Sequence, residues 1–448
     1  MASYISNTKE QQKVMLSEMG NDSIQELFAD IPEAVRLNRD LLLPPALSEL
    51  ELASYLRKLS QKNKNLDDYS CFLGAGAYDH FIPSAVGNLI SRQEFYTAYT
   101  PYQPEISQGT LQAIFEFQSM ICELTGMDIA NASMYDGATA LAEAVAMACS
   151  HTGKNEVLIA NTVHPESRDV LKTYARYKGI AVKEIGYHNG SIDLDALAAA
   201  CSDQTAAVIV QNPNFFGIIE DLGQAAERAH QHKALLIATV DPISLAILKS
   251  PGELGADIVV GDGQCLGNPI SFGGPGLGFM ATSKALMRKL PGRVVGQTTD
   301  VEGKRAFVLT LQTREQHIRR DKATSNICSN QALNALAATI YMTVLGKEGL
   351  KEVATLCLNK AHYLHDQLIQ SGKFAPVFSA PFFKEFAVSS AGDTEVLNDT
   401  LLADHIIGGY AVEQSYPELK NGWLLAVTEK RTRPEMDSLV EKAVNHCD

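Results

Sequence analysis

The stretch ALLIATVDPISLAILKSPGELGADIVVGDGQCLGNPISFGGPGLGFMAT, residues 234–282, decides the fold. An apolar run at 234–239 leads into Asp241. A second run follows at 257–260, and a third lies at 279–281 behind a glycine-rich segment. Short apolar runs bounded by Gly, Pro and Asp are typical of strands buried in a sheet. We therefore expect three core strands here, with Asp241 at the end of the first.

The same alternation extends back along the chain to residue 156, where short apolar segments are separated by helical ones. The predicted strands are 157–160, 180–185, 207–211, 235–239, 258–260 and 279–281, and the predicted helices lie near 167–177, 193–200 and 222–232. Strands joined by crossover helices form a mostly parallel sheet that is covered on both faces. This predicts an α/β fold that binds ligands beyond the carboxyl ends of its strands.

We predict three parts in the chain. Residues 1–70 are polar and helical, with prolines that interrupt the pattern, and we interpret them as an arm that wraps a larger body. Residues 71–310 form the large α/β domain, and residues 311–448 form a linker helix and a smaller α+β domain. Within the arm, Ser23 and Glu26 have the spacing of a capping box at a helix start.

Composition narrows the class of function. The 448 residues carry a formal net charge of −14, which argues against nucleic acid or an anionic membrane as the main partner. The eight cysteines form no CxxC pair, so we expect buried thiols in a reducing compartment. No run approaches the roughly 18 apolar residues of a membrane span, and the N-terminus lacks the apolar core of a signal peptide. We expect a cytoplasmic protein.

Residues 95–109, FYTAYTPYQPEISQG, carry too many prolines and aromatic residues for a helix interior and show no strand alternation. We interpret them as an ordered loop whose hydroxyl, amide and carboxylate groups line a site. A loop that serves packing alone is the alternative. The candidate site residues are Tyr96, Tyr99, Tyr102, Gln103 and Glu105.

Asp241 occupies the position of a cofactor partner in a known fold. In pyridoxal phosphate (PLP) enzymes of fold type I, the aminotransferase-like fold, an Asp at a strand end pairs with the pyridinium nitrogen, and a later Lys forms a Schiff base. Residues 234–282 resemble that region, but Gln264 stands where the Lys is expected, and no Lys lies between Lys249 and Lys284. An amide cannot form an imine, so we expect no covalently held PLP on this chain.

A turn at residues 136–139, DGAT, starts an alanine-rich helix. In PLP enzymes of this fold, the corresponding turn places a helix N-terminus under the cofactor phosphate. Here Asp136 would compete with a phosphate for the same donors, or would simply cap the helix.

Four stretches together resemble the N-terminal half of glycine decarboxylase, the P-protein of the glycine cleavage system, which many bacteria make as a separate subunit. The stretches are 15–20 with 26–28, 96–109, 255–264 with the glycine cluster at 273, and 311–328. They span the chain from end to end. The tyrosine-rich stretch and the Arg-Arg-Asp-Lys stretch are long enough to be specific.

The resemblance implies a heteromeric oxidoreductase with the PLP-dependent transferase fold. A second subunit of the same fold, subunit 2, would supply PLP and the Schiff-base lysine and decarboxylate glycine. The aminomethyl group would then pass to the lipoyl arm of the H-protein. In this family fold, active sites form at a subunit interface, so the loop at 96–105 is expected to complete the partner's pocket. We expect neither a cofactor nor a metal bound by this chain.

Two other readings stay open. A self-sufficient PLP enzyme would use Lys249 or Lys284 as its nucleophile. A scaffold without catalytic contribution would dock the H-protein through a basic segment, which contains Arg314, His317, Arg319, Arg320 and Lys322. His164 has the position of a ring-stacking residue, but we expect it to be packed or to cap a helix.

Overall fold

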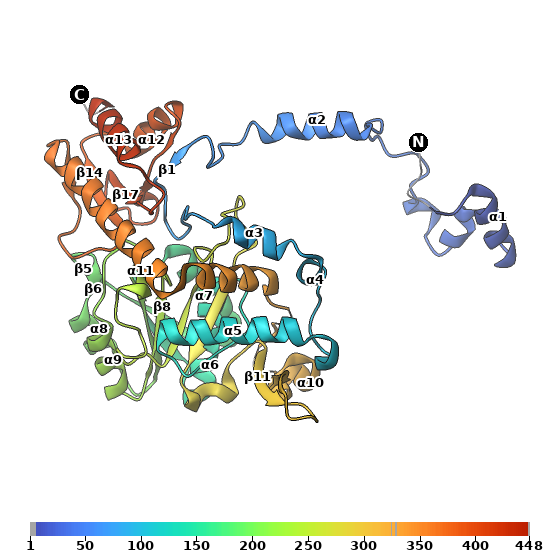
Figure 1. The fold of residues 1–448 in the computed structure, drawn as a ribbon, viewed down its shortest axis with the longest axis horizontal. Coiled ribbons are helices and arrows are strands. Elements are labelled where there is room, and N and C mark those ends of the chain that lie inside the picture. The colour runs from blue at the N-terminus through green and yellow to red at the C-terminus, as the bar shows by residue number, and fades with distance from the viewer. Residues whose placement is uncertain (1–5, 324, 328, 447–448) are drawn as a thin grey trace. The chain divides into compact units, whose positions relative to one another are not determined.

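The computed structural model describes residues 6–323, 325–327 and 329–446 of the chain (Figure 1). These residues form two compact units, one within Met1–Lys64 and one within Asn65–Asp448. The second unit contains the large sheet and the cavities that concern function. The division of the chain at residues 70 and 310 stays a prediction.

The first unit is helical. Its elements are α1 (Lys9–Glu18), the 3-10 helices η1 (Ile24–Phe28) and η2 (Glu33–Val35), and α2 (Glu49–Ser60). Both α-helices begin with a capping box, at Thr8 and at Ser48. The capping box predicted at Ser23 and Glu26 is wrong. The Ser23 hydroxyl donates to the Glu26 carboxylate over 3.1 Å and caps no backbone N–H, because this segment forms only a short 3-10 helix.

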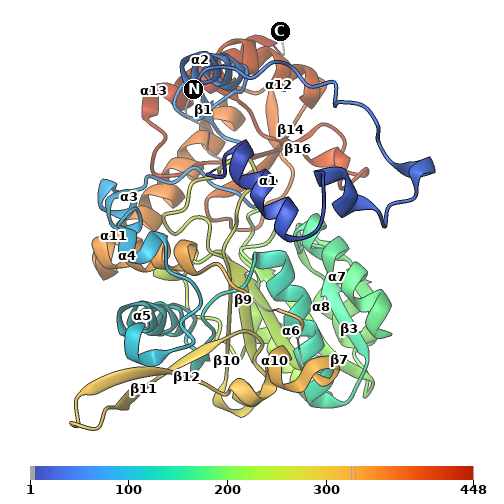
Figure 2. The same ribbon diagram turned by 90° about the vertical axis from the view of Figure 1, so that its right-hand side faces the viewer.

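A seven-stranded sheet forms the centre of the second unit (Figure 2). In spatial order its strands are β2 (Ile129–Ala130), β10 (Gly278–Thr282), β9 (Ile258–Asp262), β8 (Leu235–Val240), β7 (Thr205–Asn212), β3 (Glu156–Ala160) and β4 (Ala181–Ile185). The strands from β9 to β4 are parallel, while β10 runs antiparallel to both neighbours. The mostly parallel sheet is therefore confirmed, and each of the six predicted strands overlaps one of these.

The central strands end level with one another. Val240 of β8 pairs with Asn212 of β7 and with Gly261 of β9. The residues that follow β8 and β9 therefore emerge at the same edge of the sheet. This register brings Asp241 and Asp262 to one end of the fold, where parallel sheets bind their ligands.

Helices cover the large sheet. The helices that contact its strands are α5 (Gln108–Thr125), α6 (Gly137–Thr152), α7 (Pro165–Lys178), α8 (Leu194–Ala200) and α9 (Leu222–Gln231). The short helices α3 (Ser84–Ile90) and α4 (Gln93–Tyr96) precede α5 in the chain. Helix α6 lies across β7 to β10, and its buried Ala140, Ala144 and Ala148 let it approach the strands closely (Figure 2). Helix α9 packs against β7 and β8. Because both partners of each contact are apolar, this packing removes the core of the unit from water.

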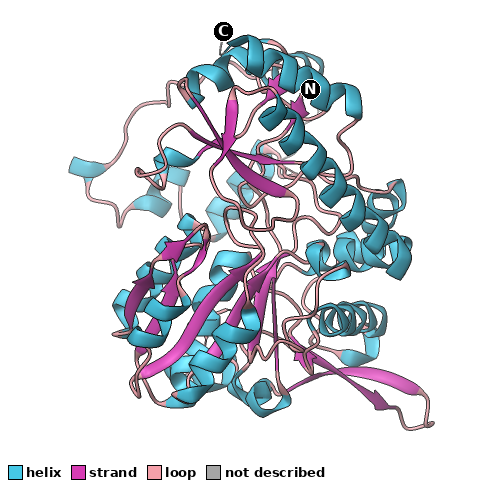
Figure 3. Cartoon of the chain, turned by 90° about the vertical axis from the view of Figure 1, so that its left-hand side faces the viewer, coloured by secondary structure: helices cyan, strands magenta, loops and turns pink. Residues whose placement is uncertain are grey.

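A second, four-stranded antiparallel sheet lies apart from the large one (Figure 3). Its strands in order are β13 (Phe374–Pro376), β14 (Glu385–Ser390), β17 (Gly422–Ala426) and β16 (Tyr410–Ala411), and it packs with α12 (Thr394–Ala403) and α13 (Arg433–His446). The fully buried Trp423 lies in its core. Helix α11 (Ala332–Gln370) contacts both cores and is interrupted at Gly346, which has a φ of 62°.

The remaining elements are short. They are the strand pairs β1 (Ser70–Cys71) with β15 (Ile406–Ile407), β5 (Tyr187–His188) with β6 (Ser191–Ile192) and β11 (Val294–Thr299) with β12 (Arg305–Thr310), together with α10 (Gln316–Arg319).

Candidate functional site

A cavity of about 470 Å³ opens at the carboxyl ends of β8 and β9. We call it the Asp241 cavity. Asp241 follows β8 directly, Gln264 lies two residues after β9, and the first turn of α6 contributes Gly137. Tyr78 reaches the same cavity from the segment before α3. The ends of parallel strands thus build the site, as the sequence predicts.

The amide of Gln264 is fully hydrogen-bonded. Its Oε1 accepts from the backbone N–H of Tyr78 at 3.0 Å, and its Nε2 donates to the carbonyl oxygens of Tyr78 at 3.2 Å and Asn268 at 2.7 Å. The side chain therefore ties the segment around Tyr78 to the end of β9. It offers the cavity no nucleophile.

Asp241 already has a cationic partner within the chain. The Lys384 ammonium lies 2.7 Å from the Asp241 carboxylate, and its side chain is only 2% exposed. Lys384 directly precedes β14 of the small sheet, so the ion pair joins the two sheets. In fold type I enzymes the corresponding carboxylate faces the pyridinium nitrogen of PLP. Here the ammonium takes the place of that ring cation.

The surroundings of Lys384 keep it charged. Burial, the largest single cause, lowers the pKa of Lys384, but the Asp241 carboxylate together with the thiols of Cys265 and Cys357 raises it by more, so the net shift is above its ordinary value. The ammonium also lies 3.6 Å from the centroid of the Tyr78 ring and donates to His80 Nε2 over 3.1 Å. An aromatic face stabilises a desolvated cation. The pair is thus a fixed part of the folded chain.

Carboxylates occupy donors at the start of α6. Asp136 caps the helix by accepting from the N–H of Thr139 at 2.8 Å, and Asp262 accepts from the N–H of Gly137 at 3.1 Å. Burial raises the pKa of Asp262, and the nearby charge of Asp136 raises it further. Of the two roles considered for Asp136, the structure shows the cap. A phosphate would have to displace these acceptors and meet two carboxylates.

The residues present in the Asp241 cavity therefore do not fit PLP. The Asp241 carboxylate is already paired with Lys384, and the donors for a phosphate are taken by Asp136 and Asp262. Among the described residues that line this cavity there is no lysine. Lys249 and Lys284 are exposed and do not line it. Lys384 itself is paired with Asp241 and is not among the described residues that line the cavity.

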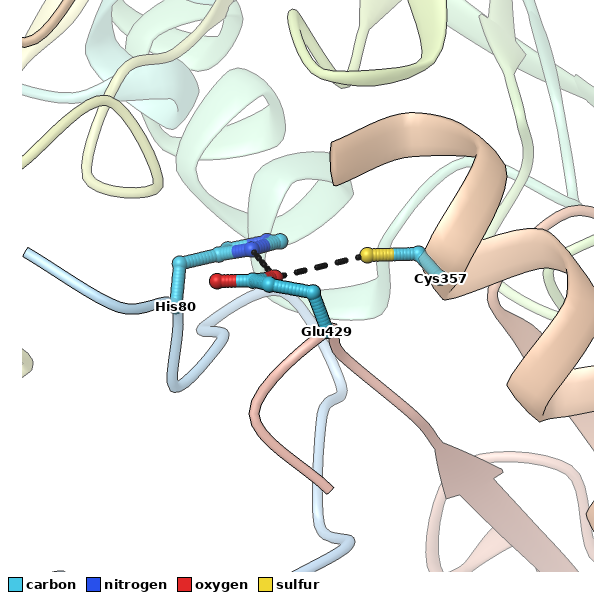
Figure 4. A group of neighbouring side chains, drawn as sticks. All are labelled: His80, Cys357 and Glu429. Carbon is cyan, nitrogen blue, oxygen red and sulfur yellow. Dashed lines mark hydrogen bonds and ion pairs between the residues drawn. The ribbon is translucent and has the colours of Figure 1, made fainter. Parts of the chain in front are cut away.

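His80, which contacts Lys384, lies next to Cys357 and Glu429 (Figure 4). The atoms of these three side chains that could coordinate a metal ion lie within 4.8 Å of one another. An ammonium can only donate, so His80 Nε2 accepts from Lys384, and the ring proton on Nδ1 is donated to Glu429 over 2.7 Å. The Cys357 thiol also donates to Glu429. A metal would have to displace both protons beside an ammonium. We interpret the group as a hydrogen-bonded cluster, and the expected absence of a metal stays a prediction.

Glu385 forms a further buried contact with the cavity wall. Its carboxylate accepts from the hydroxyl of Tyr78 at 2.7 Å and from the backbone N–H of Ala75 at 2.6 Å. Burial outweighs these hydrogen bonds and raises the pKa of Glu385 to about 7. This carboxyl group thus holds the segment from Ala75 to Tyr78 against the small sheet.

His164 caps α7, as expected. Its Nδ1 accepts from the N–H of Glu166 at 3.2 Å, which places the proton on Nε2 for donation to the carbonyl of Ala75 at 2.9 Å. The ring meets Phe215 edge to face at 5.0 Å. Burial lowers the pKa of His164, so the neutral ring is favoured.

The loop candidates lie outside the Asp241 cavity. All are exposed: Tyr96, Tyr99, Tyr102, Gln103 and Glu105. Tyr96 and Tyr99 line a second cavity of about 270 Å³, and Tyr102 lines a third of about 470 Å³. The segment is also less irregular than predicted, because Tyr96 ends α4 and Glu105 lies in the 3-10 helix η3 (Pro104–Ile106). Their role toward a partner stays a prediction.

The basic segment is only partly a surface feature. Arg314 turns inward, where its guanidinium donates to the carbonyl oxygens of Leu290 and Gly292. The exposed members are His317, Arg319, Arg320 and Lys322. Arg314 therefore anchors the segment that precedes β11, and a docking surface would have to use the remaining residues.

Sequence reasoning missed Lys384 and His80. It also missed Arg293, which lines the cavity of about 270 Å³ together with Tyr96 and Tyr99. Lys384 is separated from Asp241 by most of the second half of the chain, and no spacing rule connects a residue before β14 to the end of β8. The sequence does carry one signal for Lys384: it is a lysine in an otherwise apolar strand region. A lysine that is buried there needs an anionic partner. Arg293 gave no comparable signal.

The chain has the fold of the PLP-dependent fold type I enzymes. Glutamate decarboxylase from Lactobacillus brevis is similar to it with a TM-score of 0.70 at 13% identity, over 95% of this chain and 97% of that one, and shows the shared fold. Within the class, the model of the family "Glycine cleavage system P-protein" matches residues 2–443. The chain belongs to the glycine cleavage system P-protein family, which confirms the predicted resemblance.

Two relatives make the membership specific. A protein of Carboxydothermus hydrogenoformans, named probable glycine dehydrogenase (decarboxylating) subunit 1, is 57% identical over 98% of both chains. A crystal structure of glycine decarboxylase (P-protein) of the glycine cleavage system, in inhibitor-bound form, matches with a TM-score of 0.91 and 45% identity. That match covers 99% of this chain and 100% of the other.

The sequence predicts no membrane span, and the helices of the structure bear on this point. Within the described parts of the chain, none combines the length and the apolar character needed to cross a bilayer.

Proposed function

We propose that this chain is subunit 1 of a glycine dehydrogenase (decarboxylating) in the glycine cleavage system. It works with subunit 2, which carries the reactive lysine and PLP and decarboxylates glycine. Family membership over residues 2–443 and the name of the relative at 57% identity support this assignment. The two subunits form a heterodimer in the cytoplasm, and the aminomethyl group passes from it to the lipoyl arm of the H-protein.

One observation carries the division of labour between the subunits. The ammonium of Lys384 pairs with Asp241, and Gln264 is bonded to the backbone, so the cavity of this chain has neither a place for a ring cation nor an amine. A family member with such a cavity needs the nucleophile of another subunit. This chain therefore contributes structure and pocket residues rather than the covalent step.

The exposed loop between α4 and α5 supplies those pocket residues. A tyrosine hydroxyl donates a hydrogen bond to a carboxylate, and Tyr96, Tyr99 or Tyr102 can orient that of glycine in the pocket of subunit 2. The amide of Gln103 provides a further donor, and the carboxyl group of Glu105 can hold or move a proton. Exposure on the isolated chain suits residues that become buried when the subunits meet.

Glycine–bicarbonate exchange tests the assignment. We expect no exchange with this chain alone, no or little exchange with subunit 2 alone, and exchange when the two are mixed with H-protein. Exchange by this chain without subunit 2 would contradict the proposal. It would favour a self-sufficient enzyme that uses its own lysine.

Loop variants separate a shared pocket from a scaffold. Tyr99→Phe and Glu105→Gln should each lower the exchange rate of the mixed subunits by roughly 10²-fold if they act on glycine. Tyr177→Phe is a matched control, because Tyr177 is 82% exposed and lies on α7. Unchanged exchange in both loop variants would leave this chain the role of a scaffold that docks the H-protein.

A further inference from the structure

Arg293 is a buried cation without a buried anion. The residue is 7% exposed and directly precedes β11. Its guanidinium donates over 3.4 Å to the hydroxyl of Tyr102 and over 3.4 Å to Oδ1 of Asn330, and its Nε has no partner. Among the residues that the structure describes, no carboxylate forms an ion pair with it. The guanidinium carbon also lies 5.6 Å from the centroid of the Tyr102 ring, but no described carboxylate neutralises the charge. Burying a charge without an ion-pair partner is costly, which points to a missing counter-ion.

Arg293 lines the cavity of about 270 Å³ that also receives Tyr96 and Tyr99. Within the described lining of this cavity, Arg293 is the one charged side chain. The other walls are mostly apolar and include Phe95, Ile114, Phe117 and Leu336. Such walls strengthen an interaction between opposite charges, since little water screens it.

The start of α11 opens into the same cavity. Ala332 and Leu333, in its first turn, belong to the lining. The N-cap residue Gln331 makes no side-chain hydrogen bond to the helix. The first N–H groups of a helix lack partners within it and carry partial positive charge. Two independent positive groups therefore converge on one small, apolar space.

The neighbouring cavity, which also touches Arg293, is a poorer place for an anion. Its lining contains the carboxylates of Glu315 and Asp321 beside His317 and Arg320. Like charges would oppose an anion there. The cavity of about 270 Å³ has no such opposition in its described lining.

We infer that this cavity is a binding site for a small oxyanion, a carboxylate or a phosphate group, held by the Arg293 guanidinium and by the N-terminus of α11. A planar guanidinium can donate two parallel hydrogen bonds to such a group. The site shares Tyr96 and Tyr99 with the pocket proposed above. It does not rest on that proposal, because the isolated chain contains all of the named groups.

Thermal unfolding of the full-length chain tests the inference. The chain is titrated with sodium phosphate and, separately, with sodium acetate, each against sodium chloride at matched ionic strength. Phosphate also stabilises proteins without a site, but that effect grows steadily and is common to all variants. A saturating rise in the melting temperature reports a site. Saturation by both salts assigns a general oxyanion site, and saturation by phosphate alone assigns a phosphate site.

Variants make the test specific. Arg293→Gln should weaken the binding of phosphate at least ~10-fold, since hydrogen bonds to charged groups are strong, while its melting temperature in chloride stays equal or rises. Arg293→Lys keeps the charge and should retain weaker binding. Arg288→Gln is the matched control, because Arg288 is exposed on the 3-10 helix η5 (Lys284–Lys289). Absence of saturation with both salts, an unchanged response in Arg293→Gln, or failure of that variant to fold would each overturn the inference.

Discussion

The Lys384 ammonium lies 2.7 Å from the Asp241 carboxylate and joins the small sheet to the carboxyl end of β8. A charge that fold type I enzymes direct at a cofactor is here satisfied by a side chain of the same polypeptide. The ion pair thus makes this end of the large sheet a junction with the small sheet. This relationship underlies the proposed division of work between two subunits.

Removing the cation should destabilise the chain strongly. Lys384→Met leaves the Asp241 carboxylate buried without its partner, and we expect the free energy of unfolding to fall by about 3–5 kcal/mol. Urea denaturation followed by circular dichroism measures the change. A double variant, Lys384→Met with Asp241→Asn, should recover part of the loss because no charge is left unpaired. Simple addition of the two single effects would show that the pair is not coupled.

Restoring a lysine should not restore cofactor binding. Gln264→Lys places an amine at the expected position, but Lys384 still pairs with Asp241, and Asp136 and Asp262 still occupy the phosphate donors. We expect no pyridoxyl group at position 264 after incubation with PLP and reduction with borohydride, as measured by mass spectrometry of peptides. Labelling at that position would show that the amide alone determines the loss of the cofactor.

A close backbone approach next to the cavity wall gives a stability test. Gly217 has a φ of 81°, and an added Cβ would overlap the carbonyl oxygen of Glu385. Gly153 has a φ of 70° but has no atom within 4 Å of an added Cβ. We expect Gly153→Ala to cost about 1 kcal/mol from backbone strain alone, and Gly217→Ala to cost about 3 kcal/mol or more. Equal costs in urea unfolding would contradict the close contact.

The buried Glu385 should shape the pH dependence of stability. Burial raises its pKa from 4.5 to about 7, so in this window the folded chain holds a proton that the unfolded chain has released. The contribution to the free energy of unfolding therefore falls as pH rises from 4.5 to about 7, by about 3 kcal/mol at most. Glu385→Gln cannot titrate and should lose this slope.

The control for that measurement is Glu441→Gln, because Glu441 is exposed on α13. Urea unfolding between pH 4.5 and 8 should give this control the slope of the unmodified chain. A Glu385→Gln chain with the unmodified slope would mean that the carboxyl group titrates as it does in water.

The large sheet was predictable because its central strands are buried and therefore apolar over most of their length. The runs at 235–239 and 258–260 carry this signal, and both lie within strands of the structure, β8 and β9. The position of Asp241 followed from the same pattern, since residues after parallel strands share one edge. His164 as a helix cap was likewise local information, because its partner Glu166 is two residues away.

The contents of the Asp241 cavity were not predictable from local pattern. Asp241 pairs with Lys384, which directly precedes β14 of the small sheet. The hydroxyl of Tyr78 donates to Glu385, the first residue of that strand. Such pairs arise only when distant segments fold together, so neither periodicity nor spacing shows them. For the same reason, the sequence does not show that the Asp262 carboxylate accepts a hydrogen bond from the N–H of Gly137.

The loop between α4 and α5 shows a different limit. Prolines and aromatic residues at 95–109 correctly excluded a long helix but hid the short helical turns α4 and η3. Exposure of Tyr99 at 79% is a property that a single chain cannot explain by its own packing. We propose that these residues contact subunit 2 in an assembly.

The most direct test of the account is the location of the cofactor in the mixed subunits. This chain and subunit 2 are combined with PLP, reduced with borohydride and separated, and each is analysed for pyridoxyl-lysine by mass spectrometry. We expect the label on subunit 2 alone, with this chain unlabelled. A pyridoxyl group on any lysine of this chain, formed together with decarboxylation of glycine in the absence of subunit 2, would contradict it.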